Sequence, residues 1–236
     1  MKLRKRLSAF FCFAIAFCLQ GMATETISLN KGWKFNLCEE GVVRDCSSPS
    51  FDDTSWRTLD VPHDWSIEGR YDKSNPSGPQ GGYMPCGTGW YRKSFSLGSE
   101  YQGKRVTLRF DGVYMDSETW VNGRMVGRYP NGYNSFEYDI TPFVRFDGSP
   151  NTIAVKVDNS LQPGSRWYTG SGIYRDVNLL IDNQLHFVHD ATFARTSTAG
   201  PDEAVLDIDC RVVAHNYPET RFAWTDNTSL YVWTRN

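Results

Sequence analysis

Short alternations of apolar and polar residues recur along the chain and predict β-strands rather than helices. In a strand, side chains at every second position point to the same face, so strict alternation marks a half-buried strand. Residues 105–113 and 151–159 both have this period, and strands are also expected over 117–129 and 176–181. The first segment sets Val106, Leu108 and Phe110 against Arg105, Thr107 and Arg109, and the second places Ile153, Val155 and Val157 on one face.

Turn residues divide these strands in a way that favours antiparallel pairing. Asn122-Gly123 lies in the middle of residues 117–129 and predicts a hairpin with a type I′ turn. Trp90 and Tyr91 follow two glycines and are expected to begin another strand. No helical period is present after the N-terminal segment, so we predict an all-β chain whose first part is a jelly-roll β-sandwich.

A second unit is expected to begin near Asn183. Residues 185–196 and 204–216 both have the composition of strands. An immunoglobulin-like sandwich takes roughly 100 residues, so residues 183–236 are too few for a complete one. The predicted domains are therefore residues 24–182 and 183–236. The second strand carries a mostly alternating apolar face of Val205, Leu206, Ile208, Cys210 and Val212.

The N-terminus predicts an export signal over residues 1–23. A basic start, MKLRKR, precedes an apolar run that is too short for an ordinary membrane span, and Ala23 offers a cleavage point. The chain is thus expected to be periplasmic or secreted, with no membrane association after cleavage. The alternatives are an uncleaved anchor and a lipoprotein attached at Cys18, whose preceding residues fit that signal poorly.

Removing this segment leaves Cys38, Cys46, Cys86 and Cys210. Export permits disulfides, and Cys38 and Cys46 flank a short polar stretch, but three complete pairings stay open. The cysteines and the 4 histidines lack the grouping of a zinc site, so neither a metal nor a cofactor is expected. A net charge of −2 argues against a nucleic-acid partner.

Residues 62–89 interrupt the strand pattern with a stretch rich in Gly, Pro, Ser and aromatic residues. A loop of that length in a compact domain tends to be functional. At its start, Asp64 can accept hydrogen bonds from sugar hydroxyls, although the residue chemistry alone favours a turn cap at Asp64 with Trp65 packed inside. His63 is expected to act mainly through hydrogen bonds within the protein.

The segment 165–175 places three large side chains before a glycine-rich turn. Arg166 has five N–H donors that can contact sugar oxygens, while Trp167 and Tyr168 can stack on a sugar ring or close the end of the sandwich. No pair of carboxylates is marked for glycoside hydrolysis, so no catalytic residue is predicted.

Taken in order, these segments resemble the N-terminal part of glycoside hydrolase family 2, especially its β-galactosidases. The resemblance covers roughly residues 27–182, and relatives often carry glycine where Cys86 stands. The motifs are Gly32-Trp33-Lys34-Phe35, Phe51-Asp52-Asp53, Val61-Pro62-His63-Asp64-Trp65, Gly89-Trp90-Tyr91-Arg92-Lys93, Phe110-Asp111-Gly112-Val113, Trp120-Val121-Asn122-Gly123, and Arg166-Trp167-Tyr168 with Gly170 to Val177.

The resemblance implies a sugar-binding domain of an exported glycoside hydrolase that acts on a β-galactoside or related glycan. It implies that residues 183–236 are a partial immunoglobulin-like β-sandwich, and that the catalytic glutamates belong to a barrel that this chain does not contain. Asp64, Arg166, Trp167 and His63 are the substrate-binding residues that it implies. Two alternatives stay open, namely a free-standing carbohydrate-binding module and a structural or adhesion β-sandwich.

Overall fold

The structure is a computed structural model that describes residues 23–38, 44–161, 168–200 and 204–215. These residues form two compact units, one built from Thr26–Gln102 and Val106–Leu180 and the other including Gly103–Arg105 and the chain from Ile181 onward. The predicted export signal lies outside the described residues, apart from Ala23. None of the helices in the described part of the chain has the length and apolar character to cross a bilayer.

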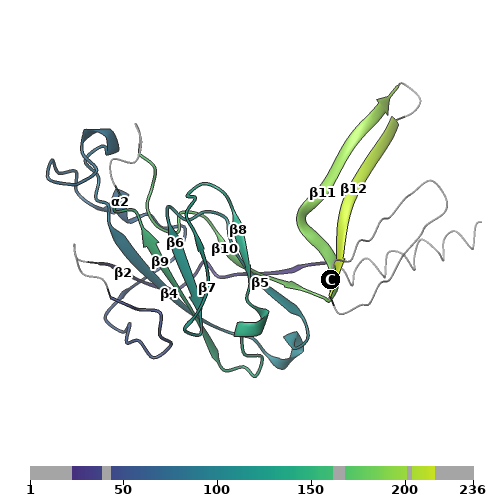
Figure 1. The fold of residues 1–236 in the computed structure, drawn as a ribbon, viewed down its shortest axis with the longest axis horizontal. Helices are drawn as coiled ribbons and strands as arrows, with labels where there is room; N and C mark the ends of the chain where they lie inside the picture. Colours follow the sequence, from purple (N-terminus) through teal and green to yellow (C-terminus); the bar gives the residue numbers. More distant parts are fainter. Residues whose placement is uncertain (1–22, 39–43, 162–167, 201–203, 216–236) are drawn as a thin grey trace, which may run out of the picture. The chain divides into compact units, whose positions relative to one another are not determined.

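The larger unit is a β-sandwich of two sheets, and the prediction of an all-β chain is confirmed (Figure 1). One sheet has the strand order β3-β2-β4-β9-β6-β7, and the other has the order β1-β10-β5-β8. The strands are β1 (Glu25–Ser28), β2 (Trp33–Leu37), β3 (Arg57–Leu59), β4 (Thr88–Ser96), β5 (Arg105–Phe110), β6 (Ser117–Val121), β7 (Arg124–Tyr129), β8 (Phe136–Asp139), β9 (Pro150–Asp158) and β10 (Val177–Asp182).

The alternating segments bury the side chains that their pattern predicts. Val106, Leu108 and Phe110 of β5 are fully buried, and so are Ile153, Val155 and Val157 of β9. Thr107 differs from the prediction because it is also buried, although the alternation assigns it to the polar face of β5. The hairpin β6–β7 turns at Asn122 and Gly123, whose φ angles of 50° and 78° are those of a type I′ turn.

The outer face of the six-stranded sheet carries a second, smaller apolar cluster. Trp90 of β4 stacks on Trp120 of β6 with ring centroids 5.2 Å apart, and buried Cys46 packs against Trp90 and Ala154. The segment that contains Cys46 and Asp53 covers this cluster. Arg92 holds the segment in place, because its Nε donates to Oδ2 of Asp53 at 2.7 Å and its Nη1 donates to the carbonyl of Cys46 at 2.5 Å. This segment therefore shields a sheet face that would otherwise expose tryptophan.

Short helical turns connect the strands. The loop that the sequence left without strands contains α2 (Trp65–Glu68) and the 3₁₀ turn η1 (Pro79–Gly81). Its central part is held by its own side chains: Ser77 Oγ donates to the carbonyl of Met84 at 2.7 Å, and Asn75 Nδ2 donates to that of Tyr83 at 2.7 Å. Two further 3₁₀ turns are η2 (Ser99–Tyr101) and η3 (Thr141–Phe143).

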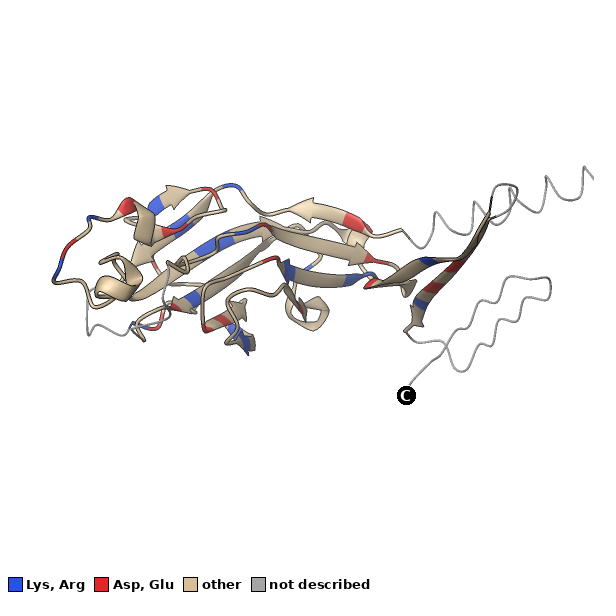
Figure 2. Cartoon of the chain, turned by 90° about the horizontal axis from the view of Figure 1, so that it is seen from above, with Lys and Arg blue, Asp and Glu red and all other residues tan. Residues whose placement is uncertain are grey.

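The smaller unit contains the antiparallel pair β11 (Leu185–Ala199) and β12 (Ala204–Ala214). Both strands lie where the sequence predicts them, whereas the domain boundary at residue 182 and the jelly-roll connectivity stay predictions. Lysine, arginine, aspartate and glutamate are interspersed along the strands of the chain, as Figure 2 shows, which agrees with its small net charge of −2.

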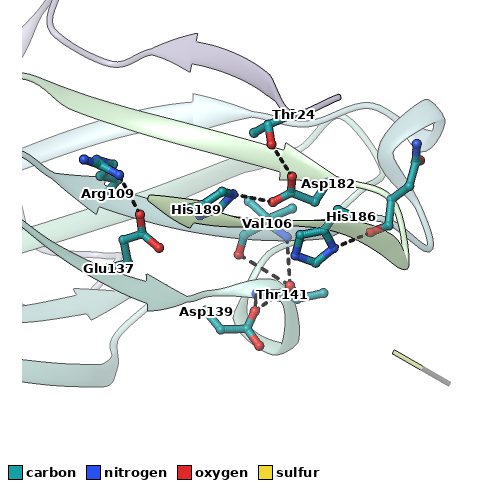
Figure 3. A network of polar contacts seen from close by, with 10 residues as sticks. Thr24, Val106, Arg109, Glu137, Asp139, Thr141, Asp182, His186 and His189 are labelled. Atoms are coloured by element: carbon teal, nitrogen blue, oxygen red, sulfur yellow. Dashed lines mark hydrogen bonds and ion pairs between the residues drawn. The ribbon is translucent and has the colours of Figure 1, made fainter. Parts of the chain in front are cut away.

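A buried carboxylate lies at the start of the smaller unit. Asp182 is fully buried, its Oδ1 accepts a hydrogen bond from Thr24 Oγ1 at 2.7 Å, and its Oδ2 lies 3.0 Å from Nε2 of His189 (Figure 3). His186 stacks on His215 with centroids 5.5 Å apart and donates from Nδ1 to the carbonyl of Asn183 at 2.8 Å. The contacts with Thr24 and His189 compensate the Asp182 carboxylate for its lost hydration.

Candidate functional site

Asp64 begins α2 as its N-cap residue. Its backbone is extended, with φ −135° and ψ 108°, and its Oδ1 accepts a hydrogen bond from the backbone N–H of Ser66 at 3.0 Å. An aspartate in this position satisfies one of the backbone donors that a helix leaves unpaired at its start. Of the two interpretations that the sequence allows for Asp64, the capping role is therefore present.

The second carboxylate oxygen of Asp64 faces a different part of the chain. Oδ2 accepts a hydrogen bond from the hydroxyl of Tyr168, and a Cβ at Gly170 would stand 3.5 Å from the same oxygen. The segment that begins at Tyr168 thus lies directly against Asp64. Burial and the neighbouring Asp64 carboxylate both raise the pKa of the Tyr168 phenol, so it stays protonated and available as a donor.

A buried set of hydrogen bonds beneath Asp64 holds these two segments together. The hydroxyl oxygens of Ser66 and Ser171 lie 2.6 Å apart, and Ser66 Oγ donates to the carbonyl of Pro85 at 2.5 Å. Asn159 Nδ2 donates to Ser171 Oγ at 2.7 Å and to the carbonyl of Gly170 at 3.1 Å. Because Ser66, Ser171 and Asn159 are all buried, water cannot replace these bonds without local opening.

Gly172 allows the segment after Tyr168 to pass close to the aromatic core. Its φ of +99° suits glycine, and a Cβ there would meet the Tyr91 hydroxyl at 2.2 Å and the carbonyl of His63 at 3.0 Å. Trp65 packs inside as the sequence predicts, since it is buried and stacks on Phe35 with centroids 5.8 Å apart.

His63 is buried, and both of its ring nitrogens have partners in the protein. Nδ1 lies 2.7 Å from the Tyr91 hydroxyl, and Nε2 lies 2.8 Å from Nη2 of Arg57 and 3.3 Å from Oε2 of Glu68. Arginine can only donate, so a neutral His63 accepts at Nε2 and carries its proton on Nδ1. Burial lowers the pKa of His63, although the Glu68 carboxylate works in the opposite direction.

The surface next to Asp64 is aromatic and open to solvent. Tyr168 is 41% exposed, and Tyr71, which lies close enough to influence its phenol electrostatically, is 75% exposed. Ile67 of α2 is exposed as well. A carboxylate bordered by exposed aromatic rings has the two kinds of group that sugar recognition uses, namely acceptors for hydroxyls and a flat apolar face.

Two of the four predicted binding residues, His63 and Asp64, lie in the part of the chain that the structure describes. Asp64 lies at the surface beside Tyr168, and His63 lies in the interior immediately before it. Arg166 and Trp167 lie outside the described residues, so their predicted contacts with a sugar stay predictions. The sequence prediction did not include Tyr168 among the binding residues, although its place in the Arg166–Tyr168 triplet was a usable signal.

Comparisons with known proteins agree with the resemblance in the sequence. The family model "Glycosyl hydrolases family 2, sugar binding domain" matches residues 26–183. A β-galactosidase of Bacteroides ovatus is 46% identical over 184 residues, which are 78% of this chain and 21% of that protein. A putative β-glucuronidase of Formosa agariphila is 40% identical over 205 residues, or 85% of this chain and 19% of that protein.

Solved structures give the same result. The crystal structure of a β-glycosidase from Bacteroides vulgatus superposes with a TM-score of 0.76 at 44% identity, covering 81% of this chain and 24% of that one. The chain thus spans about a fifth of the length of the curated relatives, at 21% and 19%.

Proposed function

Because the chain belongs to glycosyl hydrolase family 2 and contains its sugar-binding domain, we propose that Asp64 and Tyr168 form part of the substrate pocket of an exported β-glycosidase. The observation that carries the proposal is the hydrogen bond between these two residues, which come from distant segments and meet at the surface. Arg166 and Trp167, which directly precede Tyr168, are proposed to extend the same rim.

In this proposal Asp64 accepts hydrogen bonds from hydroxyl groups of the terminal sugar. Oδ1 accepts from the backbone of α2, whereas Oδ2 lies at the surface, where it accepts from Tyr168. A carboxylate oxygen has a second lone pair, so Oδ2 is the oxygen that would also accept from the sugar, with Tyr168 orienting it. The exposed faces of Tyr168 and Tyr71 offer surfaces for the C–H side of a pyranose ring. His63 would contribute indirectly, by fixing the backbone next to Asp64.

The proposed substrate is a β-galactoside or a related neutral β-glycoside. The carboxylate of Asp64 attracts hydroxyl donors but repels the carboxylate of a glucuronide. A β-glucuronide is the second candidate, because the relative from Formosa agariphila is named a putative β-glucuronidase. Hydrolysis with retention would need two carboxylates about 5–5.5 Å apart, and we propose that a part of the enzyme beyond these 236 residues supplies them.

Ligand-observed NMR of the chain with methyl β-galactoside tests the sugar contact. We expect weak saturation transfer to the sugar, lost in Asp64→Asn and kept in Asp147→Asn, which removes an exposed carboxylate that caps its own turn at Ser149. Equal transfer in wild type and Asp64→Asn would contradict the proposed role of Asp64. Stronger transfer to methyl β-glucuronide than to the galactoside would favour the second substrate.

A hydrolysis assay tests whether the catalytic carboxylates lie outside this chain. We expect the 236-residue chain to release no nitrophenol from 4-nitrophenyl β-galactoside, and turnover would show that its own residues perform the reaction. Calorimetric affinity much tighter than millimolar for free galactose would instead favour a free-standing carbohydrate-binding module. Capture of a protein partner without any sugar binding would favour an adhesion role.

A further inference from the structure

Two cysteines lie at the apolar cluster on the outer face of the six-stranded sheet. Cys46 is 2% exposed and packs with Trp90 and Ala154, and the partly buried Cys38 packs against the same cluster. Both carry thiols in the structure. Neither belongs to the surface around Asp64 and Tyr168, so the proposed function does not account for them.

The backbone holds each of these cysteines at the sheet. The N–H of Cys38 donates to the carbonyl of Thr88 at 2.8 Å, which continues the pairing of β2 with β4 by one residue. The carbonyl of Cys46 accepts from the buried Arg92 guanidinium at 2.5 Å, and Arg92 also belongs to β4. The same strand therefore positions both residues, although eight positions separate them in the sequence.

The two thiols also influence each other electrostatically. Burial raises the pKa of the Cys46 thiol to about 11, and the Cys38 thiol is the next largest contribution in the same direction. A second thiolate disfavours ionisation only at short range, because the interaction weakens with distance.

The other two cysteines are placed differently. Cys210 lies on β12 in the smaller unit, where it pairs with Thr192. Cys86 lies in the loop before β4, outside the cluster around Trp90. Of the three pairings that the sequence leaves open, the one that joins Cys38 to Cys46 therefore has the support of a shared packing environment.

We propose that Cys38 and Cys46 form an intramolecular disulfide when the chain meets a disulfide oxidant such as oxidised glutathione. The thiolate of the more accessible Cys38 attacks the oxidant, whose S–S bond breaks and releases one thiol. The thiolate of Cys46 then attacks the mixed disulfide, forms the Cys38–Cys46 bond and releases the second thiol. Two cysteine thiols are oxidised and one disulfide of the oxidant is reduced to two thiols.

The disulfide fastens the segment that covers Trp90 and Trp120 to the end of β2. Closing a loop of this length restricts the unfolded chain more than the folded one, so the oxidised chain is the more stable form. The expected gain is a rise in the melting temperature of roughly 5 °C for a chain of this size. Export, if the predicted leader functions, would bring the chain to a compartment where such bonds persist.

Peptide mapping of the folded chain tests the proposal directly. The chain is incubated with oxidised glutathione at pH 8.5, unfolded in the presence of an alkylating agent that blocks every free thiol, and digested with trypsin, which cuts after Arg44 between the two cysteines. We expect a linked pair of peptides, residues 35–44 and 45–57, that separates on reduction. Alkylated Cys38 and Cys46 after oxidation would overturn the proposal, as would a bond from either one to Cys86, Cys210 or glutathione as the final product.

Thermal unfolding provides an independent readout with matched variants. We expect oxidation to raise the melting temperature of wild type and of the double variant Cys86→Ser/Cys210→Ser to the same extent. Cys38→Ala, which changes a partly buried side chain, should fold but show no such rise. A rise that persists in Cys38→Ala, or that disappears in the double variant, would also overturn the proposal.

Discussion

The hydroxyl oxygens of Ser66 and Ser171 lie 2.6 Å apart, although 105 positions separate the two residues in the sequence. Both side chains are buried, and Asn159 joins them as a third partner. This contact fixes the start of the helix that Asp64 caps against the segment that carries Tyr168. The arrangement of Asp64 and Tyr168 at the surface therefore depends on a hydrogen bond in the interior.

Replacing Ser171 with alanine should lower the free energy of unfolding by about 1–2 kcal/mol, because buried polar groups lose a partner. Ser66 keeps its bond to the carbonyl of Pro85, and Asn159 keeps its bond to that of Gly170, which limits the loss. Urea denaturation measures the change, with Ser149→Ala in an exposed turn as the control. Equal effects of the two substitutions would contradict a special role for the buried hydroxyl.

Gly172→Ala should destabilise the chain by about 3 kcal/mol, since the new methyl group combines an unfavourable backbone conformation with overlap of the Tyr91 hydroxyl. Gly148→Ala is the matched control, because its φ is +79° but no atom lies within 4 Å of the added Cβ. We expect only about 1 kcal/mol there. Chemical denaturation of both variants separates the effect of atomic overlap from that of backbone strain. Similar decreases in the free energy of unfolding would mean that overlap with the Tyr91 hydroxyl contributes nothing.

Asp64→Ala should lower stability by about 1 kcal/mol through loss of the N-cap, while Asp64→Asn should change it by only a few tenths. Asparagine keeps a side-chain oxygen for the N–H of Ser66 but removes the charge. The comparison in urea denaturation thus separates the structural role of Asp64 from its proposed role in sugar binding. An asparagine variant as unstable as the alanine variant would show that the charge itself holds the loop.

The stability of the chain should fall on acidification in a way that depends on His63. Its pKa is lower in the folded state than in the unfolded state, where it is about 6.5, because burial disfavours the charged ring. The unfolded state then binds the extra proton first, so this stability is present above pH 6.5 and decreases as the pH falls below it.

Urea denaturation between pH 8 and pH 5 measures the dependence, and His63→Gln removes the contribution of this one group. We expect a smaller loss of stability in the variant than in wild type over that interval. The other histidines are the same in both proteins, so the difference between the two pH profiles isolates His63. Parallel pH profiles would mean that His63 does not supply the predicted dependence.

Local pattern accounts for much of the observed fold. The alternation of β5 and β9 predicts their buried faces, and Asn122-Gly123 predicts the β6–β7 turn, because strand period and turn geometry depend on neighbouring residues only. The same reasoning fails at Thr107, whose burial depends on what covers that face. It also fails at α2, which has 4 residues and is too short to show a helical period.

In the candidate site, too, some features follow from the sequence and others only from the tertiary structure. The sequence by itself determined which residue types stand at its surface: a carboxylate at Asp64, aromatic rings at Tyr71 and Tyr168, and glycines that let two loops approach. Only the tertiary structure decided that Tyr168 donates to Asp64, that Ser66 meets Ser171 and that His63 is enclosed by Tyr91 and Arg57. The physical reason is that contacts between distant segments arise when the sheets pack together, and no local period records which loops then come to lie side by side.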